Sequence, residues 1–192
     1  MNLEALAVST GVVALGEIGD KTQLLALLLA ARFRQPRPLI LGILVATVAN
    51  HALAALVGAW VRHAVPPGVL QVALAVSFFA VALWALKPDQ LDGDEVPAVS
   101  ALGVFGLTVV AFFLAEMGDK TQVATVMLAA QYAADPWALV TVTIGTTLGM
   151  MLANVPVVLF GGRVIQRVPL HWVRRATALL FALLGLLVLL AG

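Results

Sequence analysis

The chain has 192 residues, of which 62% are hydrophobic and only 11% are charged, with a formal net charge of +1. A soluble domain has about 25% charged residues, so this composition excludes an ordinary soluble domain and predicts an all-α membrane protein. The chain contains no Cys, which excludes disulfides and thiolate metal sites. We expect the lipid bilayer as its surroundings and no nucleic-acid partner.

Six apolar runs approach or exceed the length of about 20 residues that a spanning helix needs. In chain order they are residues 3–31, 39–61, 69–86, 100–130, 137–161 and 173–191. The stretches between them carry Pro and charged residues, which are typical of loops. The sequence before the first run lacks the basic segment of a secretory signal, so we expect this run to remain as a membrane helix.

A seven-residue phrase occurs twice, at an offset of 99 residues (17 to 116), with six identities: Glu17-Ile18-Gly19-Asp20-Lys21-Thr22-Gln23 and Glu116-Met117-Gly118-Asp119-Lys120-Thr121-Gln122. A second pair of matching segments contains Asn50 and Asn154. These matches predict two three-helix repeats, at 1–88 and 99–192, joined by an acidic loop at 89–98. Because each repeat holds three helices, the second must be inverted relative to the first.

The charged residues of the connections indicate an orientation. The connections after the first, third and fifth helices share one side, and they carry Arg32, Arg34, Arg37, Lys87, Arg163, Arg167, Arg174 and Arg175, against only Arg62 on the other side. The positive-inside rule makes the basic side cytoplasmic and both termini extracytoplasmic. We interpret the acidic cluster at 89–95 as a solvated loop, with capture of departing cations as the alternative.

Both motifs lie near the middle of runs of about 30 residues, longer than a membrane crossing needs. Either tilt or a helix break at Gly19 and Gly118 would accommodate this length, and broken helices are common at transporter sites. On a continuous helix, Glu17, Asp20 and Lys21 share one face. Thr22 and Gln23 would then point elsewhere unless the helix breaks at Gly19.

Ionisable residues at membrane depth are costly and usually mark an ion or substrate pathway. Each motif carries two acids and one base, so two facing copies have a formal charge of −2, which matches one divalent cation. Oxygen ligands suit Ca²⁺, Mg²⁺ or Mn²⁺. The predicted metal ligands are Glu17, Asp20, Gln23, Asn50, Glu116, Asp119, Gln122 and Asn154, and the predicted supporting residues are Lys21, Thr22, Lys120 and Thr121.

Cation exchange for protons follows from the same carboxylates. Without a cation they would be unpaired in a low dielectric, which favours their protonated form, so Glu17 and Glu116 are also the predicted proton carriers. The structural alternative pairs each Lys with neighbouring acids to hold helices together, but it leaves the repeated Thr-Gln unexplained. His51 has no counterpart, since Val155 stands at that place, and we interpret it as a hydrogen-bonded packing residue rather than a proton relay.

The two Glu-x-Gly-Asp-Lys-Thr phrases resemble the E-x-G-D-[KR]-[ST] signature, one per half, of a cation-exchanger family grouped with the lysine-exporter superfamily. The resemblance covers essentially the whole chain. The resemblance implies that Glu17, Asp20, Glu116 and Asp119 are cation-site positions. Bacterial members that resemble this chain are manganese exporters. The Golgi and chloroplast relatives exchange Mn²⁺ or Ca²⁺, and protons are the proposed counter-ion. The chain lacks the N-terminal segment and long central loop of eukaryotic members, so we expect a prokaryotic inner-membrane protein.

These observations predict a secondary active transporter that exports Mn²⁺ in exchange for H⁺ by alternating access. It is not expected to be an enzyme, because the motif lacks a nucleophile–base pair, and it needs no cofactor besides the transported ion. The alternatives are a Ca²⁺/H⁺ antiporter, an exporter of a small organic solute such as a basic amino acid, and a membrane scaffold without transport. Six helices are few to enclose a pathway, so we also consider a homodimer.

Overall fold

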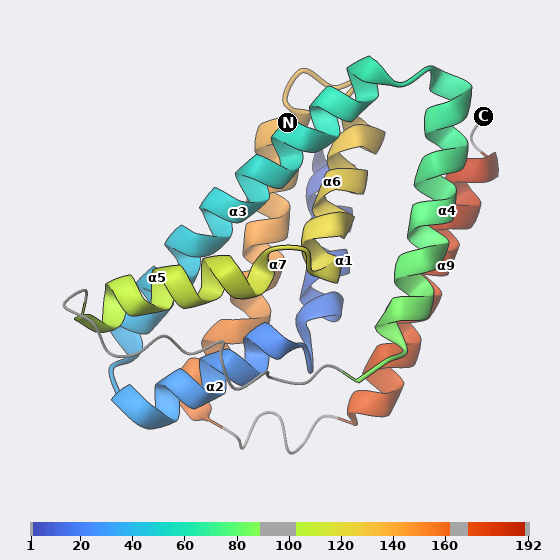
Figure 1. The fold of residues 1–192 in the computed structure, drawn as a ribbon. Coiled ribbons are helices and arrows are strands. Elements are labelled where there is room, and N and C mark those ends of the chain that lie inside the picture. Colours follow the sequence, from blue (N-terminus) through green and yellow to red (C-terminus); the bar gives the residue numbers. More distant parts are fainter. Residues whose placement is uncertain (1, 89–102, 162–168, 191–192) are drawn as a thin grey trace.

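The computed structural model describes residues 2–88, 103–161 and 169–190, and these residues form helices without any strand (Figure 1). The helices are α1 (Leu3–Glu17), α2 (Lys21–Phe33), α3 (Pro36–Ala64), α4 (Pro67–Ala85), α5 (Gly103–Glu116), α6 (Lys120–Tyr132), α7 (Ala138–Phe160) and α9 (Leu170–Leu190). The prediction of an all-α fold is confirmed. The predicted acidic loop with its cluster at 89–95, and Arg163 and Arg167, lie outside the described residues.

The first and fourth predicted runs are each broken into two helices. The first break separates α1 from α2 and the second separates α5 from α6, and Figure 1 shows α2 and α5 lying across the bundle. Gly19 (φ 82°) and Gly118 (φ 78°) take the left-handed conformation that a residue without Cβ adopts at little cost. The long runs are therefore accommodated by a break, and the shared face expected of a continuous helix does not form.

Within the described residues, four helices are long and apolar enough to cross a membrane: α3, α4, α7 and α9. Helix α5 is apolar but shorter. Helix α3 starts at Pro36, three residues before the predicted run, because Pro is well accommodated in the first turn of a helix. The predicted bounds of the other three long helices agree with the structure to within about three residues, as expected when apolar length defines them.

The two halves of the chain are interleaved. Helix α1 packs along α7, and α3 packs along α5 and α6, so each half places its broken helix against the long helix of the other half. A Cβ added to Gly145 of α7 would lie 2.8 Å from Ser9 Cβ, and one added to Gly42 of α3 would lie 2.7 Å from Thr108 Cβ. Ser9 and Thr108 are corresponding positions at the offset of 99 (9 to 108), so the halves approach each other through matching contacts.

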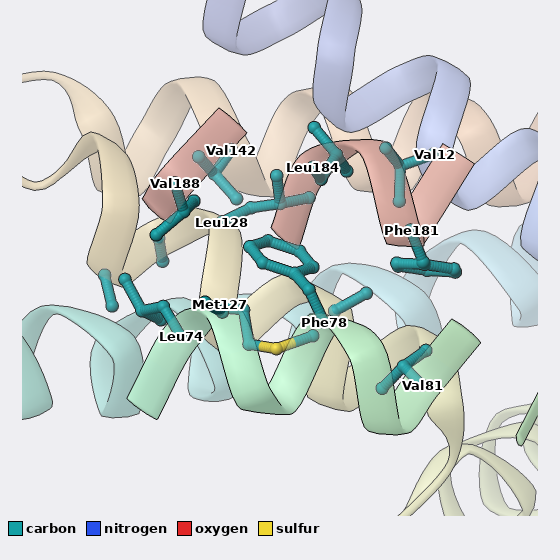
Figure 2. Close-up of a cluster of buried hydrophobic side chains, with 14 of the residues drawn as sticks. Val12, Leu74, Phe78, Val81, Met127, Leu128, Val142, Phe181, Leu184 and Val188 are labelled. Atoms are coloured by element: carbon teal, nitrogen blue, oxygen red, sulfur yellow. The ribbon is translucent and has the colours of Figure 1, made fainter. Parts of the chain in front are cut away.

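Helices α4 and α9 form a pair at one side of the bundle (Figure 1). Phe78 of α4 and Phe181 of α9 are fully buried with ring centroids 6.3 Å apart, and Figure 2 shows them within an apolar cluster that includes Val12, Leu128 and Val142. This cluster joins the α4–α9 pair to helices α1, α6 and α7. The pair is therefore attached to the bundle through apolar contacts.

Basic residues are concentrated at the helix ends on one side of the bundle. Figure 1 places the end of α2, the start of α3, the end of α4 and the start of α9 at the lower side of the bundle. Of the described residues, six basic side chains lie at or next to these ends: Arg32, Arg34, Arg37, Lys87, Arg174 and Arg175. The start of α1, the α3–α4 connection and the end of α9 lie at the opposite side, where Arg62 is found. The basic connections thus share one side, as the loop analysis predicts.

Adding one methyl group at Gly149 should destabilise the fold. Its Cβ would lie 2.6 Å from the Thr10 carbonyl oxygen and 2.8 Å from the Ala14 nitrogen, both backbone atoms of α1. We expect Gly149→Ala to lower the unfolding free energy by about 1–3 kcal/mol, measured by thermal unfolding in detergent. Gly11→Ala is the matched control, because nothing lies within 4 Å of a Cβ there. It should be neutral or stabilising by up to about 1 kcal/mol, and equal effects of the two changes would contradict the α1–α7 packing.

Candidate cation site

At each helix break, a side chain of the same motif accepts a hydrogen bond from the backbone. Backbone groups that a break releases at membrane depth must find partners within the protein. The Gly19 N–H donates to Gln23 Oε1 at 2.8 Å, and the Gly118 N–H donates to Gln122 Oε1 at 2.7 Å. The two glutamines, predicted as metal ligands, therefore use their carbonyl oxygens to satisfy the backbone at the breaks.

The two aspartates of the motifs begin the helices that follow the breaks. Asp20 is the N-cap of α2 and Asp119 is the N-cap of α6, both with extended backbone. Asp20 Oδ1 accepts the Lys21 N–H at 2.6 Å, and Asp119 Oδ2 lies 3.3 Å from the Thr121 hydroxyl oxygen. Each of these carboxylates therefore lies at the positive end of a helix dipole.

The breaks also bring the threonines to the glutamates. Thr22 Oγ1 donates to Glu17 Oε2 at 2.6 Å, and Thr121 Oγ1 donates to Glu116 Oε2 at 3.0 Å. Both glutamates are fully buried, and the Oε1 atom of each has no hydrogen-bond partner among the described residues. A buried carboxylate oxygen without a partner is costly, and a proton or a cation bound to it would remove that cost.

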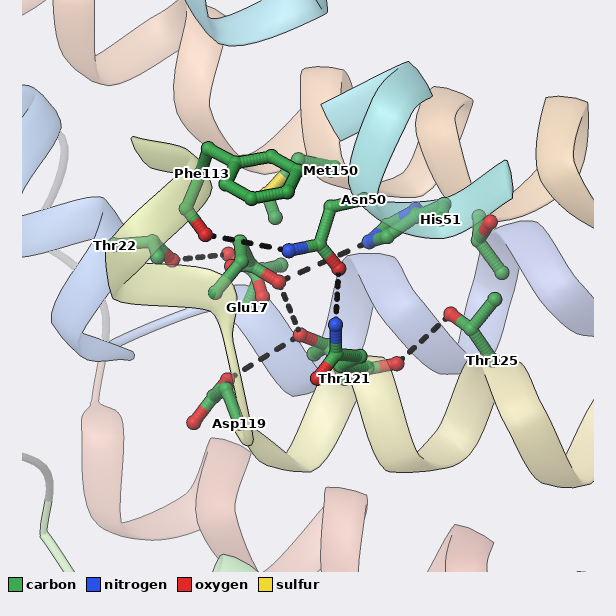
Figure 3. Close-up of polar contacts among 12 residues, drawn as sticks. Glu17, Thr22, Asn50, His51, Phe113, Asp119, Thr121, Thr125 and Met150 are labelled. Carbon is green, nitrogen blue, oxygen red and sulfur yellow. Dashed lines mark hydrogen bonds and ion pairs between the residues drawn. The ribbon is translucent and has the colours of Figure 1, made fainter. Parts of the chain in front are cut away.

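Contacts between the halves complete the surroundings of the motifs. Asn154 of α7 donates to Glu17 Oε2 at 3.3 Å, and Gln23 donates to the Ala153 carbonyl at 3.1 Å. In the other direction, Gln122 donates to Asn50 Oδ1 of α3 at 2.7 Å. Figure 3 shows Asn50 between the motif residues and the Phe113 carbonyl, to which it donates at 3.3 Å. Asn50 and Asn154 therefore each contact the motif of the opposite half.

Three carboxylates from the two halves converge. Glu17, Asp20 and Asp119 each offer an oxygen such that these atoms lie within 4.8 Å of one another, and all three residues are buried. Divalent cations bind oxygen ligands at about 2.0–2.6 Å, so a single ion between the three oxygens could contact all of them. Lys120 Nζ lies 3.2 Å from Asp20 Oδ2, which forms an ion pair between the halves. Lys21, by contrast, is only half-buried.

The fourth acid, Glu116, lies outside this group of three and faces His51. The two atoms that face each other are His51 Nε2 and Glu116 Oε2, at 3.8 Å, and both side chains are fully buried (Figure 3). Neither ring nitrogen of His51 has a hydrogen-bond partner among the described residues. The hydrogen bond expected of His51 is therefore not found there, while its packing role stays a prediction. Its position next to Asn50 is the one signal in the sequence that places it near the motifs.

The two breaks differ in their surroundings. A Cβ added to Gly19 would lie 2.8 Å from Leu170 Cδ2, so the first turn of α9 covers the first break. No described residue lies within 4 Å of a Cβ added to Gly118, and Gly118 is exposed. Within the described part of the chain, the two near-identical motifs therefore differ in how closely their breaks are covered.

An apolar helical chain with buried carboxylates contributed by two repeated halves has the construction of a membrane transporter for cations. The chain belongs to the GDT1 family of divalent cation/proton antiporters, whose sequence profile matches residues 5–93 and again 104–192. The two matched segments have the same offset of 99 residues (5 to 104) as the motif. The resemblance that the motifs indicate is thereby confirmed.

The chain is also similar to a protein of Vibrio cholerae serotype O1 named "Putative manganese exporter". The two are 53% identical over 184 residues, which cover 96% of this chain and 90% of that protein. No solved structure matches the chain.

Removing the hydroxyl that holds Glu17 should weaken cation binding. Thr22→Val keeps the shape of the side chain and deletes the 2.6 Å hydrogen bond to the carboxylate. A hydrogen bond to a charged group contributes about 1.5–3 kcal/mol, so we expect divalent-cation affinity to fall by about tenfold or more in equilibrium binding. Thr146→Val is the control, because Thr146 is equally buried but donates to the Val142 carbonyl of its own helix. An equal loss of affinity in both variants would contradict the role of Thr22.

Proposed function

We propose that this protein exports Mn²⁺ from the cytoplasm in exchange for protons, with a cation site built by Glu17, Asp20 and Asp119 and extended by the neighbouring Glu116. The observation that carries the proposal is the convergence of three buried carboxylates from opposite halves to within 4.8 Å. Membership of a divalent cation/proton antiporter family supports the reaction, and the name of the Vibrio cholerae relative supports Mn²⁺ as the cation.

The proposed organisation has six membrane crossings in two inverted repeats. The pairs α1–α2 and α5–α6 each make one broken crossing, and α3, α4, α7 and α9 make the other four. The separate family match of each half supports repeats at 1–88 and 99–192, joined by the loop at 89–98. An even number of crossings places both termini on one side, and the basic helix ends support a cytoplasmic assignment of the other side.

The proposed exchange depends on the competition of cation and proton for the same carboxylates. When a divalent ion leaves, its ligands lose their counter-charge in a low dielectric, and proton uptake at Glu17 and Glu116 restores it. The hydroxyls of Thr22 and Thr121 fit both states, since a hydroxyl donates to an ionised carboxylate and accepts from a protonated one. Lys120 remains with Asp20 and offsets one negative charge of the site.

Transport by purified protein in proteoliposomes tests the proposal. With Mn²⁺ outside and a pH dye inside, we expect Mn²⁺ uptake together with alkalinisation of the interior, because protons leave as the cation enters. Glu17→Gln combined with Glu116→Gln should lower both fluxes by at least about tenfold, a loss seen even for residues that only support a metal ligand. Glu4→Gln is the control, since Glu4 is exposed and bonds Tyr132 rather than the motifs.

The outcomes separate the alternatives. Ca²⁺ transport without Mn²⁺ transport would replace the substrate by Ca²⁺ and keep the site. Inhibition of Mn²⁺ flux by a basic amino acid, with counterflow of that solute, would favour the organic-solute exporter. Folded protein that moves neither cation would contradict the proposal and favour a scaffold. Crosslinking in the same vesicles tests the predicted homodimer, which a monomer alone would contradict.

Because the chain contains no Cys, single introduced cysteines report the orientation without background. Gln35 precedes α3 and Ala64 ends it, and both are exposed. In spheroplasts of the producing bacterium, a membrane-impermeant maleimide should label Ala64→Cys and label Gln35→Cys only after lysis. The reverse pattern would place both termini in the cytoplasm, and labelling of both before lysis would contradict α3 as a crossing.

A further inference from the structure

His51 is a fully buried histidine whose imidazole has no hydrogen bond. It lies on α3 directly after Asn50, and both of its ring nitrogens are without a hydrogen-bond partner. Leaving a buried polar atom without a partner costs about 1–3 kcal/mol. The corresponding place in the second half is filled by Val155, so packing at this position does not require a polar ring.

The distance between His51 and Glu116 distinguishes two kinds of contact. At 3.8 Å, Nε2 and Oε2 are too far apart for a hydrogen bond, which has a donor–acceptor distance of at most about 3.2 Å. Two ligands of one ion, each about 2.1 Å away, can be up to about 4.2 Å apart. The pair therefore has the spacing of two ligands on a common ion, and the dashed line from His51 in Figure 3 marks this contact.

The two glutamates consequently meet different groups across the site. Glu17 receives the amide of Asn154 at 3.3 Å, whereas Glu116 faces the imidazole of His51. Both motifs contribute a glutamate carboxylate, but helix α7 places an amide beside one and helix α3 places an imidazole beside the other. This difference places one nitrogen donor at a site otherwise composed of oxygen donors.

We propose that His51 Nε2 is a ligand of the transported cation together with Glu116, and that it makes the site select divalent transition metals such as Mn²⁺ over Ca²⁺ and Mg²⁺. Neutral imidazole binds first-row transition metals well, whereas Ca²⁺ and Mg²⁺ bind oxygen ligands. The proposal rests on the cation site of the proposed function and adds a residue and a selectivity to it.

Electron spin-echo envelope modulation of Mn²⁺ bound to the full chain in lipid nanodiscs tests the ligation directly, because a coordinated imidazole gives a ¹⁴N modulation. We expect this modulation in the wild-type protein and its absence in His51→Gln. His171→Gln is the matched control: His171 is exposed in the first turn of α9, so the modulation should persist. The wild-type spectrum decides the question even if His51→Gln does not fold.

Competition between Mn²⁺ and Ca²⁺ for the same nanodiscs measures the selectivity. His51→Gln should lower the preference for Mn²⁺ over Ca²⁺ by about tenfold, with Mn²⁺ affinity falling and Ca²⁺ affinity nearly unchanged. Equal weakening of both ions would show a structural role and overturn the proposal. Bound Mn²⁺ without ¹⁴N modulation would overturn ligation by His51 and leave the proposed function intact. Absence of any Mn²⁺ binding to folded wild-type protein would overturn both.

Discussion

The structure depends on one constraint: the backbone groups that a helix break leaves unpaired inside the bundle must find hydrogen-bond partners within the protein. Gly19 and Gly118 provide the turn, Gln23 and Gln122 accept their N–H groups, and the aspartates begin the next helices. The remaining polar residues of the phrase can then serve the site, with Thr22 and Thr121 holding the glutamates. The repeated motif therefore builds the helix break and also brings buried acidic side chains to it.

A second consequence is that neither half forms its surroundings alone. Lys120 reaches Asp20, Asn154 reaches Glu17, and Gln122 reaches Asn50, each from one half to the other. The close approach at Gly42 and Gly145 holds the halves in the register that these contacts require. A rocking motion of one half against the other would change these contacts together, which fits the exchange of cation for proton that we propose.

The sequence predicted much of this fold because length and apolar content define membrane helices, and because charged residues repeated within apolar runs indicate an ion pathway. It could not decide between a tilted and a broken helix, since Gly19 is compatible with both. It also could not show the pairing between halves, which depends on the packing of α1 against α7 and of α3 against α6. The carbonyls of Ala153 and Phe113 belong to no motif, and His51 lacks a repeat partner, so periodicity gave them no signal.

The interleaving of the halves has a consequence for biogenesis. Asp20 is made 100 residues before Lys120 (20 to 120), and Asn154 comes later still. At synthesis rates of about 5–20 residues per second, about 5–20 s pass between the synthesis of the first motif and that of the residues that surround it in the finished protein. During that interval Glu17 and Asp20 lack the partners that surround them in the finished protein. The second motif meets a completed first half as it emerges, so two almost identical phrases enter the bilayer under different conditions.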